Sequence, residues 1–469
     1  MPVAAKSLRG GRAVHWAVFM VVGVAAFLLF MQVDIIETAN HSYILLESIF
    51  SGKFRSFYGE VAAHQNDFYY LNNAHYNIIV YLLFAVAELP AFIVNNIFGL
   101  APNEVVLSYI GKTVSAVFFI GCLPLITAIA RQLNLAKAAA GWAPLMFALW
   151  PPAFFSVLVM GQYDSISLFL MLLGLWFWAK GRMIPFALVF GLAIPFKTFA
   201  ALLMIPLLLL AEKRVLHILK CAVIALWAIV PSSLVFAGHT FAMGDFTRAM
   251  TERLFAARLP FAREVPVFAL AYGLLCIVCY FWRPAREDLP RRGVWLGLAV
   301  FGLLFMFVEW HPQWLLLLAP FVVLTTLMEK QRAPWLFVDI ILCAGFFLTC
   351  AAAYPGQLEA NLFNGGIAGL ASGTQWVAGE GHATLMSLYT RVDVVRYLPT
   401  ALFSIGLGAH LILKLPLRKG TPASRFLASA PSAIPLLERK PALGVWLLFG
   451  IGFGLFWFLP TLASWLGIF

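Results

Sequence analysis

The feature that most constrains this chain is the recurrence of long apolar stretches, about every 20–30 residues, along its whole length. Stretches such as Val14–Val33 and Trp335–Ala353 are long enough to cross roughly 30 Å of hydrocarbon as helices. Hydrophobic residues make up 62% of the 469 residues and charged residues only 11%, which excludes an ordinary soluble domain. The sequence therefore predicts an all-α integral membrane protein, a single polytopic domain over residues 1–469.

Basic residues lie in short clusters between the apolar stretches and predict the orientation of the chain. Lys6, Arg9 and Arg12 precede the first stretch, which places the N-terminus in the cytoplasm. Most other basic clusters then fall on the same side, whereas most acids fall on the outer side. This distribution accounts for the net charge of +11 without a nucleic-acid partner.

Two apolar stretches need separate treatment under this orientation. Only one net crossing is allowed between Asp34 and Arg131, so the weaker stretch Tyr76–Val94 is expected to form an interfacial or re-entrant helix on the outer face. Met183–Ala211 lies between two cytoplasmic clusters, so it is expected to cross twice, turning near Lys197.

About 13 spans result. They are Val14–Val33, Val105–Ala130, Ala138–Leu158, Asp164–Ala179, Met183–Pro195, Thr198–Ala211, Leu216–Phe236, Pro266–Trp282, Val294–Val308, Pro312–Met328, Trp335–Ala353, Tyr397–Leu413 and Leu443–Pro460. Three large loops are expected on the outer face: 34–104, which carries the interfacial helices, 237–265 and 354–396.

An acid, Asp34, follows the first span directly, with Glu37 close behind it. The expected loop then continues with many Tyr, His and Asn residues and with Asp67. An acidic flank is the simplest explanation of Asp34 alone. The polar and aromatic mixture that follows is typical of a folded surface able to hold a sugar.

Two more polar motifs lie where the chain reaches the outer face. They are Gln162-Tyr163-Asp164 and Glu309-Trp310-His311-Pro312-Gln313. An acid at a membrane boundary is costly unless it faces water, a partner or a cavity, which favours a site at Asp164. The tryptophans fit an interfacial aromatic belt, but such a belt does not explain Glu309 and His311.

Cations are also expected on the outer face. Lys197 lies in a turn without an acidic neighbour in sequence, so it either snorkels to the interface or holds an anion such as phosphate. Arginines recur every five residues through the second outer loop, and Arg258 and Arg263 are candidates for a bidentate phosphate contact. Pairing with nearby acids is the alternative for most of these arginines.

In these motifs the sequence resembles the GT-C superfamily of membrane glycosyltransferases. It is most similar to the polyprenyl-phosphate-mannose-dependent mannosyltransferases of GPI-anchor and phosphatidylinositol mannoside assembly. The matching motifs, in order, are Asp34, the outer segment from Asn73, Gly111-Lys112, Gly161-Gln162-Tyr163-Asp164, Phe196-Lys197 and His311-Pro312-Gln313-Trp314. They cover about the first 330 residues. The segment His75-Tyr76-Asn77 departs from the Pro-containing pattern of many members, which leaves the acceptor open.

The resemblance implies an inverting transfer of a hexose, mannose favoured, from a polyprenyl-phosphate carrier to an acceptor hydroxyl on a lipid or glycan. Asp34 would be the catalytic base, because a sugar phosphate leaves as a stable anion and needs no general acid. Donor phosphate would contact Lys197, His311, Arg258 and Arg263. Sugar or acceptor would contact Asp164, Gln162, Tyr163, Glu37, Asp67, Glu309 and Gln313. No cofactor is indicated, and a divalent metal is left open.

Two other function classes are weighed against this enzyme. A transporter or flippase of lipid-linked sugars would place ionisable residues near the bilayer midplane and show paired repeats, neither of which the sequence suggests. A non-catalytic scaffold subunit would not need Asp34, Asp164 and Lys197 together. We expect an inner membrane protein of a bacterium, with its site facing the periplasm.

Overall fold

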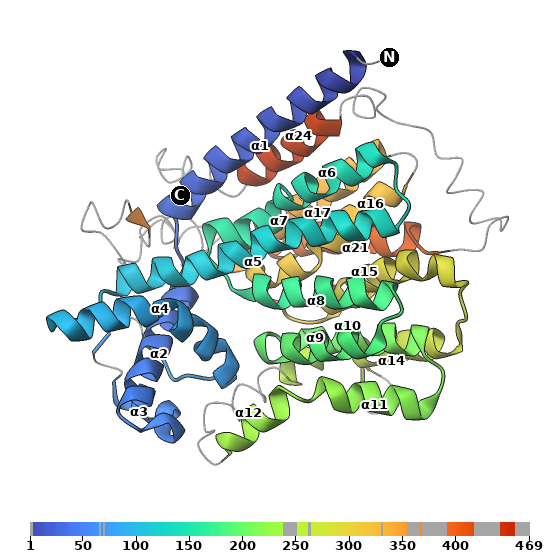
Figure 1. Cartoon of the computed structure of the whole chain (residues 1–469). Coiled ribbons are helices and arrows are strands. Elements are labelled where there is room, and N and C mark those ends of the chain that lie inside the picture. The colour runs from blue at the N-terminus through green and yellow to red at the C-terminus, as the bar shows by residue number, and fades with distance from the viewer. Residues whose placement is uncertain are drawn as a thin grey trace.

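The computed structural model describes residues 3–64, 67–68, 71–237, 251–260, 264–329, 332–353, 366–367, 392–416 and 441–454. Helices make up nearly all of this part of the chain (Figure 1). They are α1 (Val3–Leu29), α2 (Val33–Phe50), η1 (Phe54–Ser56), α3 (Phe57–Ala63), α4 (Ile78–Phe98), α5 (Glu104–Gln132), α6 (Lys137–Ala148), α7 (Pro151–Phe154), η2 (Phe155–Val159), α8 (Asp164–Ala179), α9 (Met183–Phe196), α10 (Phe199–Ala211), α11 (Val215–Ala225), α12 (Ile229–Val235), α14 (Val267–Phe281), η3 (Arg286–Asp288), α15 (Leu289–Phe307), η4 (Pro312–Leu317), α16 (Ala319–Met328), α17 (Ala333–Ala353), α21 (Asp393–Leu413) and α24 (Pro441–Phe453).

Several helices are long and apolar enough to cross a membrane. Within the described residues there are five, Arg12–Leu29, Ile78–Phe98, Glu104–Gln132, Arg286–Phe307 and Ala333–Cys350, or up to seven if each of two bent helix pairs is one span. Large apolar side chains on these helices are exposed, such as Val21 at 71% and Val117 at 59%, as expected of surfaces that face lipid. The predicted all-α, multi-span membrane fold is confirmed, while the count of 13 stays a prediction.

The predicted hairpin within 183–211 is present. α9 ends at Phe196, α10 begins at Phe199, and Lys197 adopts an extended conformation at the end of α9. Pro195 belongs to the last turn of α9, and the chain reverses directly after it. Lys197 therefore lies at the tip of a helical hairpin, as the charge pattern predicted.

Two of the predicted spans are bent helix pairs rather than straight helices. Ala138–Leu158 is divided into α6 and the α7–η2 segment, which meet at 51° just before Pro151 and Pro152. Leu216–Phe236 is likewise divided into α11 and α12, at 44°. Pro312–Met328 begins as the 3-10 helix η4 before α16 starts. Proline supplies no backbone N–H, so a helix seldom passes through it unchanged.

The predicted first outer loop folds into a small helical unit at one end of the bundle. Figure 1 shows α2 and α3 there, with α4 beside the first half of α5. A second apolar core holds this unit together and includes Tyr43, Phe57, Tyr81 and Phe92. α4 is long enough to span, so its interfacial placement stays a prediction.

The other two predicted loops are described only in part. In the loop 237–265, Arg258–Leu259 (β1) and Val265–Pro266 (β2) pair as a short antiparallel ladder. In the loop 354–396, positions 354–365 and 368–391 lie outside the described residues.

Candidate active site at the start of α2

Asp34 lies in the first turn of α2, where the chain leaves α1. Helix α1 ends at Leu29, and the N–H of Gln32 donates to the carbonyl of Met160 at 3.2 Å before α2 begins at Val33. This backbone bond joins the α1–α2 corner to the segment before α8. A carboxylate in the first turn of a helix is favoured by the unpaired N–H groups there.

Two glutamine amides hold the Asp34 carboxylate. Gln162 Nε2 donates to Asp34 Oδ2 at 2.9 Å, and Gln313 Nε2 donates to the same oxygen at 3.2 Å. Gln162 also donates to Gln32 Oε1. Within the described part of the chain, Oδ1 of Asp34 takes part in neither of these bonds, so it is the oxygen left to accept a proton.

The loop that presents Gln162 depends on an irregular helix and a glycine. η2 is a π-helix of five residues, a form that often occurs at functional sites. Gly161 follows with φ of 86°, a left-handed conformation that disfavours any side chain, and an added Cβ would meet Lys112 Cγ at 3.0 Å. Together they aim Gln162 at Asp34 and start α8 at Asp164.

Lys112 of α5 joins the two segments that carry the site. Its Nζ donates to the carbonyls of Phe27 at 2.8 Å and Val159 at 3.2 Å, and also to that of Phe30. The side chain is completely buried. Because the last carbonyls of α1 have no partner within the helix, a cation there satisfies them and fixes the end of α1 against η2.

We expect Lys112→Met to destabilise the protein by about 2–4 kcal/mol, since it leaves buried carbonyls without a donor. Thermal unfolding in detergent measures the loss. Tyr109→Phe, which removes a 2.7 Å bond to the carbonyl of Leu28 from a more exposed side chain, should cost less than half as much. Equal stability of Lys112→Met and the wild type would contradict this structural role.

Lys197 and Asp164 form an ion pair next to Asp34. Lys197 Nζ lies 3.0 Å from Asp164 Oδ1, and the Asp164 side chain is only 2% exposed. The Lys197 ammonium also lies 4.8 Å from the centre of the Trp314 ring, a cation–π contact. Asp164 Oδ2 is buried and has no hydrogen-bond partner among the described residues. This oxygen is placed to accept a bond from a ligand hydroxyl.

His311 holds an arginine that was not among the preferred phosphate contacts. Arg253 NH1 lies 2.5 Å from His311 Nε2, and a guanidinium can only donate, so Nε2 is the acceptor. Burial and the charges of Arg253 and Lys197 lower the pKa of His311 to about 4, which keeps its ring neutral. His311 therefore positions a cation, and Arg253 carries the charge.

Burial and neighbouring polar groups shift the pKa of the Asp34 carboxyl. Burial raises its pKa, the hydrogen bond from Gln162 and the charge of Lys197 lower it, and the charge of Asp164 raises it again. Glu37, one turn further along α2, binds Asn72, and burial followed by the charge of Asp34 raises its pKa to about 7. A carboxylate with a raised pKa accepts protons better than an exposed one.

For the sugar transfer that the sequence predicts, we expect Gln162→Leu to move the acidic limb of kcat/KM to higher pH. A base works only when deprotonated, so kcat/KM rises as the pH passes the pKa of Asp34, and losing the Gln162 bond raises that pKa further. Transfer assays across a pH series measure the shift. Asn40→Leu, on α2 but bonded to Glu104, is the control whose limb should not move. An unmoved limb in Gln162→Leu would separate Gln162 from the base.

The structure gathers most predicted site residues but leaves some elsewhere. Asp34, Gln162, Gln313, Asp164 and Lys197 lie together, and their neighbours include Tyr163, which packs edge-on against Tyr76, as well as Glu37 and His311. The placement of Arg263 lies outside the described residues.

Three predicted contacts are placed away from this group. Arg258 is exposed and pairs with Glu264 at 2.8 Å, the pairing that was weighed as its alternative. Asp67 is exposed near Glu47, and its N–H donates to the carbonyl of His64. Glu309 is exposed. In the described part of the structure, these three residues do not contact Asp34 or Lys197. Their roles in binding stay predictions.

Several residues near Asp34 were missed by the sequence-based prediction. Gln32 and Arg253 contact the predicted residues directly, and His75 is close enough for its charge to act on Asp34. The position of Gln32, two residues before Asp34 at the end of a span, is the only sequence signal for it. Among the described residues, no group of three or more His, Cys, Asp or Glu is arranged to hold a metal ion.

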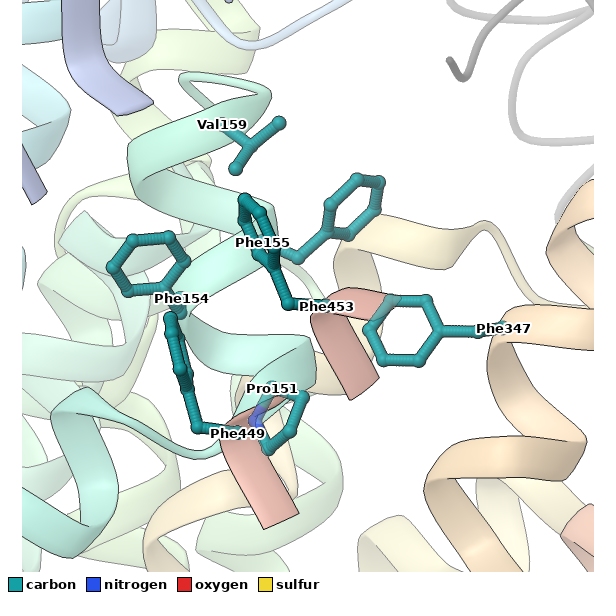
Figure 2. A pocket seen from close by; sticks show the side chains of 7 residues that line it. All are labelled: Pro151, Phe154, Phe155, Val159, Phe347, Phe449 and Phe453. Carbon is teal, nitrogen blue, oxygen red and sulfur yellow. The ribbon is translucent and has the colours of Figure 1, made fainter. Parts of the chain in front are cut away.

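An apolar pocket lies between the α7–η2 segment, α17 and α24 (Figure 2). It is lined by Pro151, Phe154, Phe155, Val159, Phe347, Phe449 and Phe453, and its volume is about 10 Å³. A cavity of this size holds at most one water and offers it no polar partner. Here α17 and α24 pack against the α7–η2 segment through aromatic side chains.

No family model matches the sequence, and no curated protein matches it. Two solved structures of ArnT from Cupriavidus metallidurans are similar in outline, both at 14% identity. The apo structure gives a TM-score of 0.41 over 86% of this chain and 76% of that one. The structure bound to undecaprenyl phosphate gives 0.39 over 95% and 78%.

Proposed function

We propose that this protein is an inverting glycosyltransferase of the GT-C type that uses a polyprenyl-phosphate-linked sugar as donor. The observation that carries the proposal is the cluster formed by Asp34, its two glutamine amides and the Lys197–Asp164 pair. These residues come from four separate segments of the sequence. An acid that only flanks a span, or a lysine that only snorkels to the interface, would not need polar partners from other segments of the chain.

The cluster supports the chemistry of a single base. Asp34 Oδ1 would take the proton of the acceptor hydroxyl while that oxygen attacks the anomeric carbon of the donor sugar. The bond from that carbon to the phosphate oxygen breaks, and the polyprenyl phosphate leaves with the bonding electrons. Because a phosphate is a stable leaving anion, a second carboxylic acid is not required. Attack from the opposite face inverts the anomeric configuration.

Two cations would stabilise the leaving phosphate. Arg253 presents a planar guanidinium, held by His311, and Lys197 presents an ammonium against Trp314. A guanidinium matches two phosphate oxygens at once, whereas an ammonium acts as a point charge. Asp164 Oδ2 and Gln313 Oε1, both buried acceptors without a partner among the described residues, suit sugar or acceptor hydroxyls.

The finer assignments rest on the resemblance in the motifs. We propose a hexose, with mannose favoured, a lipid or glycan acceptor, and a site that faces the periplasm from a bacterial inner membrane. The bilayer would deliver the polyprenyl tail, which needs no soluble carrier.

The test is an incubation of purified protein in lipid nanodiscs with a panel of polyprenyl-phosphate sugars and candidate acceptors. We expect one donor to be consumed with release of free polyprenyl phosphate and formation of a product of inverted anomeric configuration. A transporter would move the intact donor between the leaflets of a vesicle and release no polyprenyl phosphate, which would overturn the proposal.

A further inference from the structure

An apolar groove lies beside the α14–α15 connection, far from the Asp34 site. Its walls are the C-terminal half of α14, Trp295 of α15, and Leu415 and Pro416 just after α21. Its volume is about 550 Å³, well within the range of sites that hold small ligands, about 300–1,000 Å³. Figure 1 shows this connection at the end of the bundle opposite α2 and α3.

Two buried nitrogen donors near the groove have no hydrogen-bond partner among the described residues. The guanidinium of Arg292 lies 5.0 Å from the centre of the Trp282 ring, and Trp282 lines the groove. Arg292 Nε and the indole N–H of Trp295 are buried, and neither has a hydrogen-bond partner among the described residues. Trp295 is only 9% exposed. Positions 292 and 295 share one face of α15, and both side chains adjoin the groove, Trp295 as a lining residue and Arg292 through its contact with Trp282.

Among the residues that the structure describes, no carboxylate forms an ion pair with Arg292. Asp288 lies one turn earlier and its charge acts on Arg292, but within the described chain no acid approaches the guanidinium to ion-pair distance (4.0 Å). A buried donor without an acceptor costs about 1–3 kcal/mol, and a bound anion would remove that cost. The two donors therefore indicate an acceptor that the described residues do not supply.

The shape and chemistry of the groove indicate a lipid. An arginine matches the oxygens of a phosphodiester, and tryptophans are enriched at the level of lipid headgroups. The outer wall of α14 is apolar and open, with Ile277 and Val278 each 55% exposed, so an acyl chain can lie along it. Arg283 and Arg291 stand nearby in sequence, on the side predicted to be cytoplasmic, where anionic lipids attract basic clusters.

We propose that this groove binds one anionic phospholipid, with its phosphate on Arg292 and the Trp295 N–H and an acyl chain along α14. The site is separate from sugar transfer and would exist even if the protein were not an enzyme. The groove would select an anionic phospholipid over a neutral one by the net negative charge of its headgroup, since the acyl chains of the two lipids are alike.

Titration of the purified protein with phosphatidylglycerol, and separately with phosphatidylcholine of the same acyl chains, tests the proposal. Native mass spectrometry counts the lipids retained. We expect one phosphatidylglycerol to bind about five- to tenfold more tightly than phosphatidylcholine. Arg292→Gln should abolish this preference, and Trp295→Phe should weaken it about threefold by removing one hydrogen bond.

Arg286→Gln is the matched control, because Arg286 belongs to the same connection but its guanidinium packs against Gly181. Its preference for phosphatidylglycerol should equal that of the wild type. Equal binding of the two lipids, binding of neither, or an unchanged preference in both Arg292→Gln and Trp295→Phe would each overturn the proposal. Trp295→Phe keeps the test valid if Arg292→Gln does not fold.

Discussion

Replacing Asp34 by Asn is expected to lower the rate of sugar transfer by about 10³-fold, within the range that general-base catalysis contributes. Asn keeps the size of the side chain and offers an oxygen to the amides of Gln162 and Gln313, but it cannot take a proton. The loss should therefore appear in kcat, with little change in KM for the donor. Release of polyprenyl phosphate from a labelled donor measures both.

Glu47→Gln provides the matched control for this substitution. Glu47 is also an acid of α2, but it lies near His64 and Asp67 and its charge is not among those that act on Asp34. Its variant should transfer sugar at close to the wild-type rate. If Asp34→Asn retained more than about a tenth of the activity while folding normally, Asp34 would not be the base.

The parts of the site that could be predicted share a simple physical property. Asp34, Asp164 and Lys197 are charged groups at the edges of apolar stretches. A charge there costs free energy unless it faces water, a partner or a cavity. The positive-inside rule also placed the turn of the α9–α10 hairpin at Lys197, because both flanks of the hairpin are basic. These conclusions need only local composition and the orientation of the chain.

The missed contacts depend on tertiary structure that a linear pattern does not contain. Four arginines recur at equal spacing in the loop 237–265, and only the approach of His311 distinguishes Arg253 from Arg258, which pairs with Glu264. The bonds from Lys112 to the end of α1 join residues more than 80 positions apart. The prolines Pro151 and Pro152 are a sequence signal for the bend that precedes them. Hydrophobicity alone does not reveal this bend, because the apolar stretch continues across it.

Replacing Lys197 is expected to lower kcat/KM for the donor by about 10²–10³-fold, since removal of one group that stabilises developing charge typically costs this much. Lys197→Met keeps much of the side-chain volume but leaves Asp164 buried without its cation, which by itself destabilises by about 3–5 kcal/mol. In this single variant, the loss of stability and the loss of the phosphate contact both lower activity, so the variant does not separate them.

The double variant Asp164→Asn, Lys197→Met separates the two effects. It removes both charges, so its thermal stability should recover most of what Lys197→Met loses, while transfer stays low because no ammonium faces the donor phosphate. Lys53→Met, at an exposed lysine paired with Glu60, should change neither quantity. If activity returned together with stability in the double variant, the pair would serve only to hold α8 against the α9–α10 hairpin, and the phosphate contact would fall to Arg253.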